Sequence, residues 1–180
     1  MSLFLVGCSD LLNETPRSSF TPEYFKTQAG VMGGLTYMYS HLRGMYGQGY
    51  YYNSCETGTD ESTYGQSADG NFKNFDLSGV GSMTSDNYPM AILWGSTFPN
   101  INTASGVIEY GTTAGVSDGL IAEARFFRAF DYFLLVQTFG GVPLDLGAGE
   151  LKFNTSTSRT SKRNTVPEVY TKAIFPDLLF

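Results

Sequence analysis

The 180-residue sequence predicts an all-α protein whose helices are separated by a long irregular loop. Two observations predict the helices: apolar residues recur at spacings of three and four, and capping residues stand where these runs begin. A third observation predicts the loop, because this periodicity disappears from Gly44 to about Ser85, where glycine and aromatic residues are frequent. Loops of such length without regular structure are often functional.

The first predicted helix begins after Thr21, with Pro22 at the first helical position and Glu23 near the positive end of the helix dipole. Phe20 and Phe25 stand at the positions of a hydrophobic staple. Two apolar rows then run to the region of Tyr46, which predicts one helix with a wide apolar face. The first row is Phe25, Ala29, Met32, Leu35, Tyr39, Leu42 and Tyr46, and the second is Tyr24, Val31, Met38 and Met45.

The second predicted helix covers about Tyr88 to Tyr110, with Gly111 as its stop. Pro99 lies inside it, and we expect a kink or break there because proline removes a backbone hydrogen bond. Trp94 could present its ring to a ligand. Its place in the apolar stripe of this helix instead favours a position in the core.

The third predicted helix begins at the capping residue Ser117 and includes an almost wholly apolar run from Leu120 to Phe139. The sequence 140–143, Gly-Gly-Val-Pro, ends it. A helix this apolar must be buried on most sides, yet four charged residues lie on it: Glu123, Arg125, Arg128 and Asp131. Because a buried charge must be paired, we predict a structural ion-pair network here in preference to a catalytic set.

The last predicted helix begins with a capping box formed by Thr165 and Glu168, and Pro176 interrupts its pattern. The sequence ends at Phe180 within an apolar run that has no predicted partner. An apolar face left in water is unfavourable, so we expect a truncated chain.

Composition excludes several functions. The formal net charge of −6 and a pI near 4.6 argue against nucleic acid as a partner and against electrostatic docking on anionic lipid. With His41 as the single histidine, neither a histidine-based metal site nor histidine-centred catalysis is expected. We find no catalytic motif and predict no metal site, although the acidic pair Asp60 and Glu61 leaves calcium open.

The first residues resemble the end of a bacterial lipoprotein signal. An apolar run from Leu3 leads into Leu-Val-Gly-Cys, in which Cys8 would be the lipid attachment site. The alternative is a plain apolar tail, because the run is short and no basic residue precedes it. We therefore divide the chain into a signal remnant and tether, residues 1–19, and an incomplete helical domain, residues 20–180.

Together these segments resemble the N-terminal part of the SusD/RagB family. The most specific stretch is 122–133, AEARFFRAFDYF, which leads into VQTFGGVPL at 136–144. The segments 8–12, 58–61, 94–108 and 163–170 also resemble family motifs. Pro99, Asp131 and Pro176 depart from the family pattern.

The resemblance implies a tetratricopeptide-like helical-repeat scaffold and a surface lipoprotein of the Bacteroidetes outer membrane. Such a protein captures oligosaccharide without cleaving it and passes it to a SusC-like TonB-dependent transporter. Two alternatives stay open: a repeat protein that binds a peptide or protein partner, and a surface glycoside hydrolase that uses a carboxylate pair.

Ligand contacts are predicted in the long loop, because carbohydrate is held by aromatic faces together with carboxylate or amide groups. The candidate residues are Tyr50, Tyr51, Tyr52, Asp60, Tyr64 and Asn71. The alternative is that these tyrosines pack the loop onto the helices.

Overall fold

In the computed structural model, the described residues are 20–47, 51, 55–63, 73–75, 84 and 88–180. These residues are largely helical and contain no β-strand, only an isolated bridge between Asp145 and Glu150. The predicted all-α class is thus confirmed. Within this part of the chain, no helix combines the length and the apolar character needed to cross a membrane.

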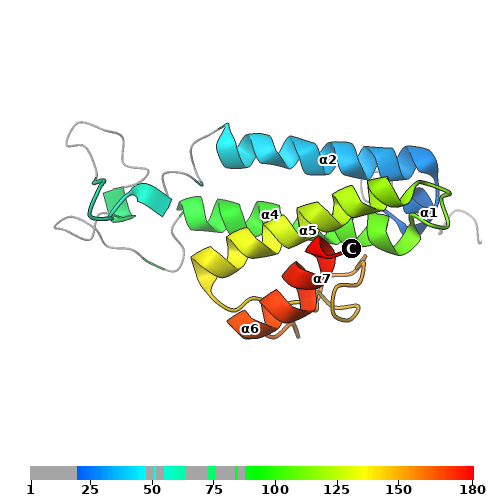
Figure 1. Ribbon diagram of the computed structural model, residues 1–180. Helices are drawn as coiled ribbons and strands as arrows, with labels where there is room; N and C mark the ends of the chain where they lie inside the picture. The colour runs from blue at the N-terminus through cyan, green and yellow to red at the C-terminus, as the bar shows by residue number, and fades with distance from the viewer. Residues whose placement is uncertain (1–19, 48–50, 52–54, 64–72, 76–83, 85–87) are drawn as a thin grey trace, which may run out of the picture.

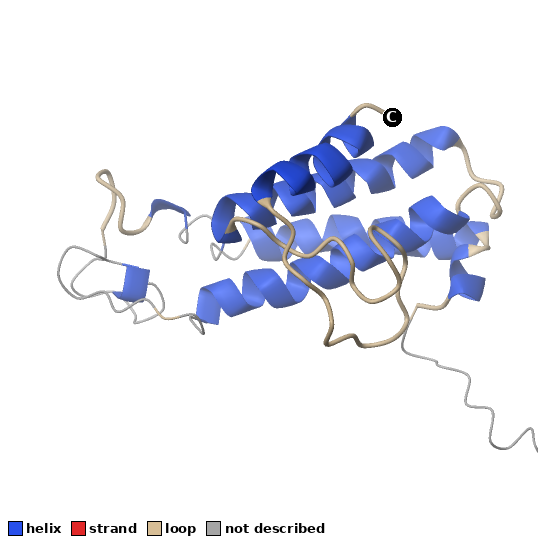
Figure 2. Cartoon of the chain, turned by 90° about the horizontal axis from the view of Figure 1, so that it is seen from below, coloured by secondary structure: helices blue, strands red, loops and turns tan. Residues whose placement is uncertain are grey.

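Three long helices run side by side (Figures 1 and 2): α2 (Gln28–Tyr46), α4 (Tyr88–Tyr110) and α5 (Asp118–Phe139). The short helix α1 (Pro22–Phe25) precedes α2. A C-terminal helix packs against α5; it consists of α6 (Val166–Val169), a π-helical segment (Tyr170–Ile174) and α7 (Phe175–Leu178). A single 3₁₀ turn, Lys73–Phe75, is described within the predicted long loop.

The first helix is divided, contrary to the prediction of one continuous helix. Thr21 caps α1 as expected, but α1 ends after one turn and Thr27 caps α2 by accepting a hydrogen bond of 3.0 Å from the Gly30 backbone N–H. The Thr27 hydroxyl also donates to the carbonyl of Tyr24, at 2.9 Å. One threonine therefore satisfies backbone groups of both helices at the corner between them.

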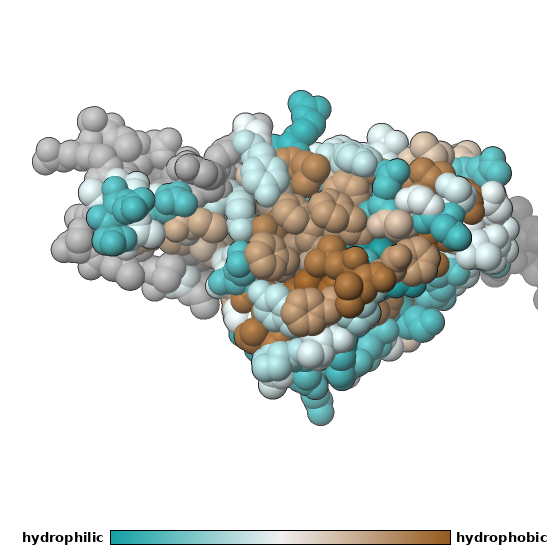
Figure 3. Space-filling view, in the orientation of Figure 1, coloured by the Kyte–Doolittle hydropathy of each residue, from teal (hydrophilic) through white to brown (hydrophobic). Residues whose placement is uncertain are grey.

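The rows of α2 are also exposed differently from the prediction. Val31, Met38 and Met45 of the second row are buried, as is Leu35 of the first row, whereas Met32, Tyr39 and Tyr46 of the first row are exposed. Apolar side chains also gather on the face of the molecule formed by α5 and α7 (Figure 3). The exposed large apolar residues of these two helices and the chain end are Phe126, Phe133, Phe175, Leu178, Leu179 and Phe180.

Helix α4 continues through Pro99, so the predicted break does not occur. The hydrogen bond that proline removes would have reached the carbonyl of Gly95, four residues earlier. Pro99 and Gly95 both lie on the exposed side of α4. Water can bind that carbonyl, which explains why the helix tolerates the proline.

The C-terminal helix likewise continues through Pro176, contrary to the predicted interruption. Its capping box forms as predicted, with the Thr165 backbone N–H donating to Glu168 Oε2 at 2.8 Å. The π-helical segment lies directly before Phe175 and Pro176. An α-helical turn there would place the carbonyl of Lys172 against the proline ring, and the wider turn relieves that clash.

Three clusters of buried residues hold the described helices together. One joins α4, α5 and the C-terminal helix through residues that include Ile101, Tyr132 and Val169. Another joins α1, α2, α4 and α5 around Phe25 and Phe127. The third joins α2, α4 and α5 through Met45, Leu93 and Leu134. Helix α5 contributes to all three clusters, which explains why the sequence makes it apolar on nearly every side.

Candidate functional site

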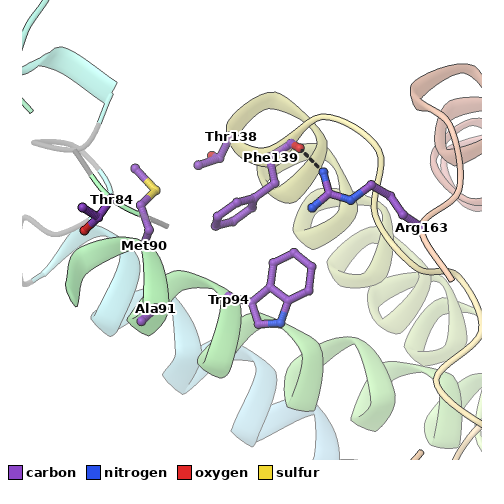
Figure 4. A pocket seen from close by; sticks show the side chains of 7 residues that line it. All are labelled: Thr84, Met90, Ala91, Trp94, Thr138, Phe139 and Arg163. Carbon is purple, nitrogen blue, oxygen red and sulfur yellow. Dashed lines mark hydrogen bonds between the residues drawn. The ribbon is translucent and has the colours of Figure 1, made fainter. Parts of the chain in front are cut away.

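A hollow of about 700 Å³ lies between the N-terminal part of α4, the C-terminal end of α5 and the loop before α6 (Figure 4). Its lining is mostly apolar, with a few polar groups that could fix the orientation of a ligand, which is the usual composition of a small-molecule site. The lining residues are Thr84, Met90, Ala91, Trp94, Thr138, Phe139 and Arg163.

Trp94 forms one wall of this hollow, which we call the Trp94 hollow. The same side chain also lies at the edge of the core. Its indole packs edge-on against the rings of Phe139, with centroids 5.1 Å apart, and Phe98, at 4.7 Å. The side chain is half-buried and packs against the cluster around Ile101. Two aromatic contacts thus hold the indole in place beside the hollow, as a platform for a flat apolar ligand face requires.

Arg163 fixes the end of α5 beside the hollow. Its Nη1 donates a hydrogen bond of 2.9 Å to the carbonyl of Phe139, the last residue of that helix. The backbone at residue 141 can approach that of Asn164 closely because residue 141 is glycine. A Cβ there would lie 2.0 Å from the carbonyl oxygen of Asn164. Close backbone approach at Gly141 therefore brings the loop that carries Arg163 against the end of α5.

Of the six loop residues predicted to bind ligand, the structure describes Tyr51 and Asp60. Tyr51 is half-buried and packs near Tyr46, with ring centroids 6.3 Å apart. It borders a cavity of about 150 Å³ with His41 and Leu93, and burial raises the pKa of its hydroxyl. Asp60 is exposed in a turn, and neither residue lines the Trp94 hollow. The other four, Tyr50, Tyr52, Tyr64 and Asn71, lie outside the described residues.

The sequence interpretation did not include Thr138, Phe139 or Arg163 among the site residues. The sequence does show that these residues lie beside helix ends. A Gly-Gly-Val-Pro stop follows Phe139, and a capping box follows Arg163. These features predict where each helix ends, but they do not predict that both ends border the same hollow.

The charged residues of α5 do not form one network, because they contact different partners. Arg125 and Arg128 both pair with Asp177 of α7, at 2.9 and 2.6 Å. Glu123 takes no part in this group, which corrects the predicted network. It lies on the side of α5 that meets α2, where it accepts a hydrogen bond of 3.1 Å from the Tyr39 hydroxyl.

Asp131 lies in a separate buried polar cluster between α2, α4 and α5. One of its carboxylate oxygens accepts a hydrogen bond of 2.7 Å from Asn100 Nδ2, and the other lies 3.7 Å from His41 Nε2. Burial raises the pKa of Asp131 to about 8, although the Asn100 hydrogen bond opposes this shift, and burial lowers the pKa of His41. The cluster joins three helices without an arginine or lysine.

The described residues of the hollow offer groups that can bind a ligand. Among the described residues that line the hollow, none is an aspartate, a glutamate, a cysteine or a histidine. Across the described ranges, no three histidine, cysteine, aspartate or glutamate side chains come together in a way that could hold a metal ion. The arrangement can hold a ligand between an aromatic face and hydrogen-bond donors.

Comparison with known proteins places the chain in a family. Residues 10–178 match the model of a SusD-like family described as starch-binding and associating with the outer membrane. SusD-like protein P2 of Formosa agariphila is 27% identical over 196 aligned positions, which cover 99% of this chain. The chain spans 37% of the length of that protein. Because the family match covers nearly all of the sequence, this chain belongs to the SusD-like family.

Proposed function

We propose that this chain is part of a surface-exposed glycan-binding lipoprotein, which captures oligosaccharide and passes it to a SusC-like TonB-dependent transporter. The observation that carries the proposal is the family match over residues 10–178, because that family is described as starch-binding and outer-membrane-associated. The attachment point would be Cys8, whose lipid would keep the binding domain at the membrane surface.

The Trp94 hollow has the chemistry that sugar binding requires. A pyranose presents one face of C–H groups, which packs on an aromatic ring, and a rim of hydroxyls, which need directional hydrogen bonds. Trp94 and Phe139 supply aromatic surface, while Thr138 and Arg163 supply polar groups. Tyr51 and Asp60 remain candidates for contacts elsewhere on the ligand.

Glycoside hydrolysis receives no support from the described lining of this hollow. That reaction generally uses two carboxyl groups that flank the scissile bond, separated by roughly 5–10 Å. Of the lining residues that the structure describes, none is an aspartate or a glutamate. The proposal is binding without cleavage, in keeping with a family described as starch-binding.

Trp94 provides a direct test because it is the single tryptophan of the sequence. We expect its fluorescence to change saturably when the protein, without Cys8, is titrated with a soluble polysaccharide that affinity gels have shown to bind. Trp94→Phe should weaken binding in gels and calorimetry, while Phe126→Ala should not. Phe126 is a matched control because it is an exposed aromatic residue that does not line the hollow.

The outcomes separate the hypotheses. Saturable binding with no released reducing sugar supports the proposal, and release of reducing sugar would point to a hydrolase. Binding that responds to Tyr51→Ala but not to Trp94→Phe would move the site to the long loop. Failure of a folded protein to bind any glycan would contradict the proposal.

A protein partner is a second candidate function, favoured by the exposed apolar residues of α5 and α7. Contiguous apolar surface of this kind commonly marks a protein contact. Saturable binding of a peptide, competed by neither polysaccharide nor oligosaccharide, would support this alternative.

A further inference from the structure

In one segment of this acidic protein, all the charged residues are basic. Residues 151–167 contain no aspartate or glutamate, although the whole chain carries a net charge of −6. The basic residues of the segment are Lys152, Arg159, Lys162 and Arg163, all of them exposed. No carboxylate of the described residues forms an ion pair with any of these four.

This absence of partners contrasts with other cations of the molecule. Lys26 pairs with Glu23, Lys172 pairs with Glu150, and the two arginines of α5 share Asp177. Positive charge that has no local partner, in a chain with excess negative charge, is available for an external anion.

Arg163 brings this unpaired charge to the hollow. Figure 4 shows its guanidinium beside Phe139, with the indole of Trp94 bordering the same space. The hydrogen bond from Nη1 to the Phe139 carbonyl holds the group in place. It leaves the remaining N–H groups without a partner in the part of the chain that the structure describes. A planar guanidinium held in this way is suited to carboxylate and sulfate oxygens, which it can bind through two parallel hydrogen bonds.

We propose that the Trp94 hollow selects an acidic sugar. The carboxylate or sulfate group of the sugar binds Arg163, and a face of its ring packs against Trp94. A neutral sugar would gain the aromatic contact but not the charge-assisted hydrogen bonds. This inference rests on the proposed glycan-binding function and adds the chemical class of the ligand.

The charge of Arg163 can be separated from its structural contact. Arg163→Gln removes the charge and keeps an N–H donor that can reach toward the Phe139 carbonyl. Arg163→Lys keeps the charge and loses the planar pair of donors. Arg159→Gln is the matched control, because Arg159 is an unpaired, exposed arginine of the same segment that does not line the hollow.

The test is calorimetry with pairs of ligands that differ in charge. One arm uses oligogalacturonate and its neutral methyl ester, and the other uses a sulfated galactan oligosaccharide and its desulfated form. We expect one acidic member to bind about tenfold more tightly than its neutral partner, with a preference that falls as salt rises. Arg163→Gln should reduce this ratio to near one, Arg163→Lys should keep part of it, and Arg159→Gln should leave it nearly intact.

The possible failures are distinguishable. If glycans bind but acidic and neutral partners bind the wild-type protein equally, the acidic-sugar inference is overturned and glycan binding stands. If no carbohydrate binds a protein with native circular dichroism, the proposed function fails and this inference fails with it. If Arg163→Gln does not fold, Arg163→Lys decides: a reduced acidic preference supports the contact with Arg163, and a preference equal to that of the wild-type protein overturns it.

Discussion

Arg128 on α5 and Asp177 on α7 form a bidentate, buried ion pair, with the Arg128 Nε to Asp177 Oδ2 distance at 2.6 Å and the Nη2 to Oδ1 distance at 2.8 Å. The remaining nitrogen, Nη1, donates to Ser105 Oγ on α4 and to the carbonyl of Leu151. One guanidinium therefore joins α4, α5, the loop after α5 and the C-terminal helix, with each of its nitrogens bonded.

Replacing Asp177 by alanine should strongly destabilise the protein. The substitution leaves two arginines facing each other without a carboxylate, and breaking a buried pair in this way costs about 3–5 kcal/mol. Urea unfolding measures this loss. Lys172→Ala is the control, because it breaks the exposed Lys172–Glu150 contact of 2.8 Å on the same helix and should leave the midpoint almost unchanged. Similar shifts for both variants would contradict the prediction.

Stability should depend on pH through Asp131. Its pKa is about 8 in the folded protein against an ordinary value of 3.8, because the carboxyl is buried. Between roughly pH 4 and pH 8, the folded protein holds a proton that the unfolded chain has released, so this stabilising contribution is lost as pH rises. Relative to wild type, Asp131→Asn should gain up to about 1.4 kcal/mol for each pH unit across this range.

Unfolding free energies at pH 5, 7 and 8.5 give that comparison. The lowered pKa of His41 acts in the opposite direction, with stability lost as pH falls below its ordinary value of 6.5. This contribution largely cancels when the variant and the wild type are compared at one pH, and His41→Gln in both backgrounds controls for it. A difference that stays constant with pH would contradict the assignment of a protonated Asp131.

Gly106 should not tolerate a side chain. A Cβ there would lie 2.5 Å from the ring of Phe25, where α1 and α4 pack closely. Gly106→Ala should destabilise the protein by about 1–3 kcal/mol through overpacking. Gly95→Ala on the same helix is the matched control, since a Cβ there meets nothing within 4 Å, and it should stabilise the helix by roughly 1 kcal/mol or less. Thermal unfolding of both variants checks the sign of each effect.

The exposed aromatic residues of α5 should drive self-association of this chain at high concentration. Phe126 is 52% exposed and Phe133 is 37% exposed. Replacing both with serine should shift sedimentation profiles toward the monomer while leaving the unfolding midpoint nearly unchanged. Unchanged sedimentation would mean that these two rings do not carry the association.

The positions of the helices could be predicted from the sequence more reliably than their exposed faces. Tyr88–Tyr110 was predicted at its observed bounds, and the stop at Gly140 is visible in the structure as a positive φ of 71°. Which apolar residues of α2 are buried depends on the neighbouring helices, because both rows are apolar. The apolar pattern continues across Thr27, the capping residue of α2. The boundary between α1 and α2 therefore could not be predicted from periodicity alone.

Site residues were harder to predict, because a hollow is a property of several segments. Trp94 was assigned to the core, and it does pack there, yet one side of it also borders the hollow. Arg163 is an exposed arginine in a polar loop, and only the close approach at Gly141 places it beside Phe139. The partner of the α5 arginines, Asp177, likewise became evident only from the packing of the C-terminal helix.

The π-helical segment Tyr170–Ile174 contains one residue more than a regular α-helical turn would hold. This extra residue sets the rotation of α7 about the helix axis. Each α-helical residue turns the chain by about 100°, so deletion of a single residue here would restore a regular α-helix and rotate α7 by about that angle. The carboxylate of Asp177 would then point away from α5, and a different face of α7 would be turned inward. The number of residues in this short segment thus determines that Asp177 faces the two arginines of α5.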